Sequence, residues 1–187
     1  MSIEPPLHAE VVAFWREAGP EKWFAKDDAF DQALRERFEA LHFAAARGEL
    51  ADWAETAEGA LALILLTDQI PRNIFRGSAH AFATDPMARA LAERAVRQDF
   101  AMEVEAPLRP FFYLPFEHSE HPADQDCAVV LFEGHAEDTG DQESLKWAVL
   151  HRDLIDRFGR FPHRNACLGR ESTEEELEYL AGDGFKG

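Results

Sequence analysis

Apolar residues recur at helical spacing along most of the chain. One set falls on a single helical face: Leu34, Phe38, Leu41 and Ala45. Asp27 or Asp28 supplies an N-cap ahead of this set, and Gly48 supplies a left-handed residue behind it. The pattern predicts a long amphipathic helix between these boundaries.

The apolar run over residues 61–66 follows Thr56 and has apolar residues on all sides, which is typical of a helix enclosed by other helices. Asp85 and Pro86 predict the N-cap and the first residue of another helix. Further helices are predicted over residues 107–116, from Pro122, over residues 144–158, and after a capping box of Ser172 and Glu175.

No segment alternates polar and apolar residues as a β-strand does, and no linker rich in Pro or Gly separates the helices. Helices joined by short turns are typical of antiparallel helix pairs. We therefore predict an all-α protein that forms one domain over residues 1–187.

Charge narrows the choice of partners. The chain has 36 acidic and 19 basic residues and a formal net charge of −17. Such a surface repels phosphate backbones and anionic lipids, so we expect no nucleic-acid partner and no membrane partner. Residues 1–15 lack the pattern of a signal peptide, which predicts a cytoplasmic protein. The sequence is also compatible with a homodimer.

Two stretches place a proline shortly before an Arg-Asn pair and a glycine after it: DQIPRNIFRGS (68–78) and FGRFPHRNACLGR (158–170). In the first turn, Pro71 predicts a break in the helix, and Arg72 is expected to reach back to the last carbonyls of that helix. In the second turn, Gly159 is expected to end a helix and Pro162 to open a short one.

Two interpretations of these turns stay open. Helix ends with buried arginine-to-carbonyl bonds need these residue types for stability alone. Alternatively, both turns face one cavity and present Arg72, Arg164 and His163 to a small anionic molecule or a peptide. The candidate ligand-binding residues are Asp68, Arg72, Asn73, Arg76, Arg160, Arg164 and Asn165.

Four residues are candidates for acid-base catalysis: His118, Glu120, His151 and His163. Histidines that meet across a pocket can exchange protons near neutral pH, although a lone histidine on a core face is more often a buried, hydrogen-bonded residue. The run around His118 and His121 lacks a recognised metal-ligand pattern, so no metal site is predicted, and no cofactor is assigned. The segment GDGFKG (182–187) matches a dinucleotide-binding spacing, but no strand precedes it and no helix follows it.

Four segments carry a resemblance to a known family: LLTDQIPRNIFRG (65–77), FYLPFEHSE (112–120), PADQD (122–126) and HRDLIDRFGRFPHRNACLGRESTEEELEYL (151–180). Together they resemble the bacterial family catalogued as domain of unknown function 924, over nearly the whole chain from Val11. The resemblance implies an all-α fold grouped with tetratricopeptide-like, right-handed helical superhelices, and it implies no established activity. Thr67 and Glu117 depart from the family pattern, in which an aliphatic residue and a methionine are expected.

The resemblance marks a set of signature residues: Asp68, Gln69, Pro71, Arg72, Asn73, Arg76, Gly77, Leu114, Pro115, His118, Ser119, Glu120, Asp124, Gln125, His151, Arg152, Asp153, Arg160, Pro162, His163, Arg164 and Asn165. So many polar residues exceed what core packing requires, because each buried polar group needs a partner. We expect a helical protein that binds a small anionic ligand or a peptide in a pocket lined by Arg and His. The alternatives are a hydrolase that uses the His and Glu candidates, and a structural protein-protein interaction module.

Overall fold

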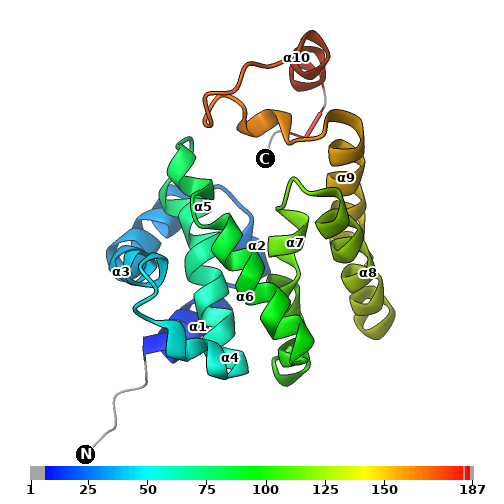
Figure 1. The fold of residues 1–187 in the computed structure, drawn as a ribbon. Helices are drawn as coiled ribbons and strands as arrows, with labels where there is room; N and C mark the ends of the chain where they lie inside the picture. Colours follow the sequence, from blue (N-terminus) through cyan, green and yellow to red (C-terminus); the bar gives the residue numbers. More distant parts are fainter. Residues whose placement is uncertain (1–6, 183, 186–187) are drawn as a thin grey trace, which may run out of the picture. The chain divides into compact units, whose positions relative to one another are not determined.

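The computed structural model describes residues 7–182 and 184–185 (Figure 1). These residues form helices and connecting turns without any β-strand, which confirms the all-α prediction. Contacts between Cα atoms group the chain into two compact units. The first unit comprises Met1–Arg76 and His80–Pro115, and the second comprises Gly77–Ala79 and Phe116–Gly187. A single domain over residues 1–187 and a tetratricopeptide-like superhelix stay predictions.

The first unit contains, in chain order, α1 (Leu7–Ala18), α2 (Pro20–Trp23), α3 (Asp28–Ala46), α4 (Ala57–Ile64), α5 (Ile70–Ile74) and α6 (Asp85–Arg97). A 3-10 segment, Ala106–Phe112, follows where one α-helix over residues 107–116 was expected, and α7 (Leu114–Glu117) leads into the second unit. The second unit contains α8 (Pro122–Thr139), α9 (Gln142–Phe158), the 3-10 turn Pro162–Arg164 and α10 (Glu174–Ala181).

Helix α4 is the core element of the first unit, as its apolar run predicted. Leu61 and Ile64 have no exposed surface, and α4 packs against both α1 and α6. A side chain that leaves water completely contributes about 1.5–3 kcal/mol to folding, so this helix anchors the unit. No helix in the described part of the chain has the length and apolar character needed to cross a membrane.

The helix boundaries follow local chemistry, with two corrections. The Asp27 carboxylate caps α3 by accepting hydrogen bonds from the next two free amides, and the Gly159 backbone ends α9 at φ +69°. Asp85 does not cap α6 as predicted, because its carboxylate is bound by an arginine instead. The last capping box lies one residue later than predicted and joins Thr173 to Glu176, whose side chain also serves the second turn.

The predicted break at Pro71 was wrong. A π-helical turn, Leu65–Gln69, precedes α5, and the backbone stays helical through Pro71. Proline lacks an amide hydrogen and its ring crowds the carbonyl four residues earlier. A π-helical turn widens the backbone, and the Ile70 amide bonds to the carbonyl of Leu65, five residues back. The wide turn therefore accommodates the proline without ending the helix.

Candidate functional site

The first turn places Arg72 between two carboxylates of its own unit. The Arg72 guanidinium lies 3.1 Å from an oxygen of Asp68 and donates two hydrogen bonds of 2.9 Å to Asp85. Burial lowers the pKa of Arg72, but the charges of Asp68 and Asp85 outweigh it and raise that pKa. The Asp68 side chain is 1% exposed, so its charge depends on this arginine and on the Gln69 amide that donates to it.

Arg72 also reaches back along its own helix. Its Nη1 donates to the Asp68 carbonyl oxygen at 2.7 Å, which confirms the predicted arginine-to-carbonyl contact. The Asn73 side chain binds a different helix. Its amide donates to Asp31 on α3, at 2.7 Å. This hydrogen bond joins α5 to α3, and both of its residues line a pocket on the surface of the unit.

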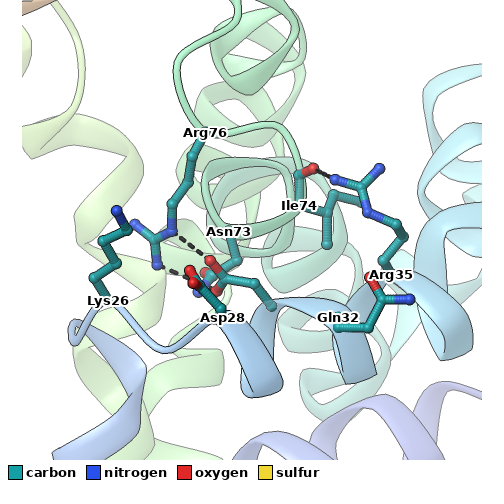
Figure 2. A pocket seen from close by; sticks show the side chains of 8 residues that line it. Lys26, Asp28, Gln32, Arg35, Asn73, Ile74 and Arg76 are labelled. Atoms are coloured by element: carbon teal, nitrogen blue, oxygen red, sulfur yellow. Dashed lines mark hydrogen bonds and ion pairs between the residues drawn. The ribbon is translucent and has the colours of Figure 1, made fainter.

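The charged pocket is a depression of about 240 Å³ in the first unit. Its lining residues are Lys26, Asp28, Asp31, Gln32, Arg35, Asn73, Ile74 and Arg76 (Figure 2). In Figure 2, Lys26 and Arg76 lie on the left, Gln32 and Arg35 lie on the right, and Asn73 and Asp28 lie between them. Two of the predicted ligand-binding residues, Asn73 and Arg76, therefore share a cavity.

Asp31 organises one wall of the charged pocket. One of its oxygens accepts from Arg76 Nε at 2.6 Å, and the other accepts from Asn73 and, at 3.3 Å, from Arg76 Nη2. On the opposite wall, Arg35 donates to the Ile74 carbonyl and lies 3.3 Å from Glu39. These contacts hold the guanidinium groups of Arg35 and Arg76 in fixed orientations.

The second turn is centred on Glu176, a residue of α10 whose side chain is 2% exposed. Its carboxylate accepts from Arg160 at 2.6 and 2.8 Å, from the Asn165 amide at 3.2 Å and from the Thr173 backbone at 2.8 Å. These hydrogen bonds, with that of Arg160 first among them, lower the pKa of Glu176 to about 2. Arg160 and Asn165, both predicted ligand-binding residues, thus share a buried carboxylate.

Glu120 and Arg164 also serve the second turn. Glu120 accepts from the Phe161 amide at 2.8 Å and pairs with Arg170 at 2.6 and 2.9 Å. Burial raises the pKa of Glu120, but the Arg170 and Phe161 hydrogen bonds outweigh it and lower that pKa. Arg164 is buried, donates to the His118 carbonyl at 3.0 Å and lies over the Phe161 ring at 4.4 Å. The Arg164 guanidinium therefore contacts residues of its own unit, the His118 carbonyl and the Phe161 ring.

The three candidate histidines gather in the second unit. His151 Nδ1 lies 3.0 Å from a Glu117 oxygen, and both side chains are buried. The His118 and His151 rings lie 6.5 Å apart, while His163 packs on Phe161 at 5.6 Å. Burial and the neighbouring Arg164 charge lower the pKa of His163 to about 3, so this ring is a neutral imidazole near pH 7. A group with that pKa is a weak proton acceptor at neutral pH.

The structure therefore sorts the predicted residues into separate groups within each unit. The first unit brings together Asp68 with Arg72, and Asn73 with Arg76. The second unit brings together Arg160 with Asn165, and His118 with His151. Because Arg72 and Arg164 belong to different units, one pocket shared by both turns stays a prediction. Within the described residues, no group of three or more His, Cys, Asp or Glu side chains is placed to hold a metal ion.

Sequence reasoning missed the partners that these residues find. Asp31 lies 42 residues from Asn73, and Glu120 lies 50 residues from Arg170. No motif in the surrounding sequence distinguishes Lys26, Asp31 and Arg35 from the other charged residues of the chain. Glu117 had a signal, because it departs from the methionine expected in the family, and it is the residue that binds His151.

Comparisons with known proteins agree with the all-α fold. A solved structure of a protein of unknown function from Agrobacterium tumefaciens is 53% identical in sequence, with a TM-score of 0.87. The similarity covers 93% of this chain and 96% of that chain. A search of curated proteins gave no match. The family model described as bacterial protein of unknown function (DUF924) matches residues 11–184, and the chain belongs to this family.

Proposed function

We propose that the protein binds a small anion in the charged pocket of the first unit. The observation that carries the proposal is the lining itself, where Lys26, Arg35 and Arg76 outnumber the two carboxylates. This excess of positive charge occurs in a chain whose formal net charge is −17. A local cationic site on an acidic protein directs anions to one place, because the rest of the surface repels them.

Lys26 is the group best suited to hold the anion. Asp31 is already engaged by Asn73 and Arg76, so those partners form a wall with little remaining freedom. The Lys26 ammonium, by contrast, forms no hydrogen bond or ion pair with another residue that the structure describes. An ammonium carries three donors, and a bound carboxylate or phosphate oxygen would accept one or two of them.

The size of the charged pocket limits the ligand. Its volume of about 240 Å³ lies just below the range of about 300–1,000 Å³ that is usual for small-molecule sites. The charged pocket therefore suits a ligand of few atoms, such as inorganic phosphate or a short dicarboxylate. A peptide would engage it through one terminal carboxylate or one acidic side chain.

A thermal-shift titration with sodium phosphate and sodium succinate tests this proposal, with sodium chloride at equal ionic strength as the reference. A ligand that binds the folded state raises the melting temperature, and one present at about 100 times its Kd adds about 2.7 kcal/mol of stability. We expect a rise with at least one of the two anions, and we expect Lys26→Gln to abolish it.

Lys22→Gln is the matched control, because Lys22 is an exposed lysine of α2 that does not line the charged pocket. This variant changes the net charge equally and should keep the full shift. Equal loss in both lysine variants would contradict the proposal and would indicate a diffuse charge effect. A wild-type protein that neither anion stabilises would contradict it as well.

The other expectations from the sequence remain predictions. They are binding of a peptide, hydrolase chemistry, a structural role in protein-protein interaction, a homodimer and a cytoplasmic location. Among the groups considered for hydrolysis, His151 forms a buried pair with Glu117, and Glu120 is occupied by Arg170. These contacts favour binding in the charged pocket over proton transfer as the function to test first.

A further inference from the structure

The second unit contains an aromatic pocket of about 570 Å³ between residues of α9 and the C-terminal segment. The side chains that line it are Trp147, Leu150, Glu178, Tyr179 and Phe185. Gly182 and Gly184 complete the lining with backbone alone. This volume falls inside the usual range for small-molecule sites, about 300–1,000 Å³.

Specific contacts hold the wall of the aromatic pocket in place. The Phe185 amide donates to the Tyr179 hydroxyl oxygen at 2.8 Å. A Cβ atom at Gly184 would lie 2.5 Å from the Tyr179 carbonyl oxygen and 2.7 Å from its ring, so only glycine allows this approach. The glycine spacing noted in the sequence therefore serves packing against Tyr179.

The lining offers aromatic faces to a ligand. Trp147 is 44% exposed, and its ring centroid lies 5.8 Å from that of Phe185. Aromatic faces attract cations through their quadrupole, and Trp does so most strongly. The Tyr179 ring already shows this behaviour, because the Arg157 guanidinium carbon lies 5.7 Å from its centroid.

The negative charge in the lining of the aromatic pocket favours a cationic ligand. Glu178 is the acidic side chain in the lining, and the described lining contains no Lys, Arg or His. No other described residue forms an ion pair or hydrogen bond with the Glu178 side chain. An open carboxylate beside exposed aromatic rings complements a positive charge attached to an apolar body. An anion would meet repulsion both here and from the net charge of −17.

We infer that the aromatic pocket binds a small organic cation, an ammonium group that carries an apolar or aromatic body. The ammonium lies near Glu178 and the Trp147 face, and the apolar body lies against Leu150 and Phe185. This inference is independent of the anion proposed for the charged pocket, since the two sites share no residue.

Isothermal titration calorimetry with three ligands of similar shape tests the inference: 2-phenylethylammonium, 2-phenylethanol and phenylacetate. We expect the ammonium to bind about tenfold more tightly than the neutral alcohol, and phenylacetate to bind most weakly. Glu178→Gln should weaken the ammonium by about tenfold and leave the alcohol unchanged. Trp147→Ala should weaken both the ammonium and the alcohol.

Asp156→Asn is the matched control, because Asp156 is an exposed carboxylate of α9 that does not line the aromatic pocket. It removes the same charge from the same unit and should leave all three affinities unchanged. Glu178 is exposed, so its substitution is not expected to prevent folding. Equal affinities for the ammonium and the alcohol would overturn the inference. An ammonium affinity that Glu178→Gln and Asp156→Asn reduce equally, or no binding at millimolar concentration, would do so too.

Discussion

The two turns share a proline ahead of an Arg-Asn pair, but the backbone around that proline differs between them. In the first unit, Pro71 lies inside a continuous helical path, because a π-helical turn precedes it. In the second unit, Pro162 starts a 3-10 turn after Gly159 has ended α9. A proline ahead of an Arg-Asn pair is therefore compatible with either a continued or an interrupted helix, and the preceding residues decide which of the two forms.

The charges of the two turns are also used differently. In the first turn, Arg72 is held inside the unit, while Arg76 and Asn73 line the charged pocket. In the second turn, Arg160 and Asn165 converge on the buried carboxylate of Glu176. The first turn thus combines a stabilising pair with a surface pocket, whereas these residues of the second turn stabilise the end of their unit.

Arg72→Met removes the cation that contacts both Asp68 and Asp85, and we expect the largest loss of stability from this change. Leaving a buried carboxylate without its charge partner costs about 3–5 kcal/mol. Urea unfolding followed by circular dichroism measures the change. Arg94→Met is the control in the same unit, because its pair with Glu55 is largely exposed and surface pairs contribute less than about 1 kcal/mol. Equal losses in the two variants would contradict the role assigned to Arg72.

Glu176→Gln is expected to destabilise the second turn by about 2 kcal/mol, because it weakens the charge-assisted hydrogen bonds from Arg160 and the Thr173 amide. Arg160 keeps some access to water, which makes this loss smaller than that at Arg72. The same unfolding assay applies. Glu175→Gln is the neighbouring control, since Glu175 pairs with Arg157 at the surface. A control variant as unstable as Glu176→Gln would argue against a buried network.

The smallest expected effect is the contribution of His163, in the second turn, to the pH dependence of the unfolding free energy. The pKa of His163 is lowered from 6.5 to about 3 by burial and by Arg164. Between these two values the unfolded chain binds a proton that the folded chain does not, so stability falls as pH decreases. The contribution of His163 is at most about 1.4 kcal/mol between pH 6.5 and 5.5.

His163→Gln should remove this contribution, so the unfolding free energy of the wild type relative to that of the variant should fall as pH decreases from 6.5 to 5.5 and should level off above pH 6.5. Urea titrations at pH 5.5, 6.5 and 7.5 measure it. Carboxylates contribute equally to both proteins, so the comparison isolates His163. A difference that does not vary with pH would mean that the folded protein also protonates this ring.

Local patterns accounted for several features of both turns. The reach of Arg72 to the Asp68 carbonyl was predictable, because residues four positions apart on a helix are neighbours. The end of α9 at Gly159 was predictable from its left-handed conformation. The continuation through Pro71 was not, because a π-helical turn depends on packing around the helix, and Pro71 alone favours a break.

The candidate sites were predictable only in part. Arg76 and Asn73 were identified from their residue types, but the carboxylate that holds them, Asp31, comes from a distant helix. Asp85 was assigned to a helix cap, but it forms a half-buried ion pair with Arg72 instead. The aromatic pocket had no sequence signal, because Trp147 and Phe185 lie 38 residues apart along the chain.

The sequence by itself determined the helices, the enclosed α4, the acidic surface and the membership of the family, because periodicity, charge and signature residues are local properties of the chain. Only the tertiary structure decided which carboxylate each arginine meets and which side chains border a cavity. Those outcomes depend on contacts between residues far apart in sequence. The favourable partner for a buried charge is whichever opposite charge the packing of the helices brings within hydrogen-bond distance.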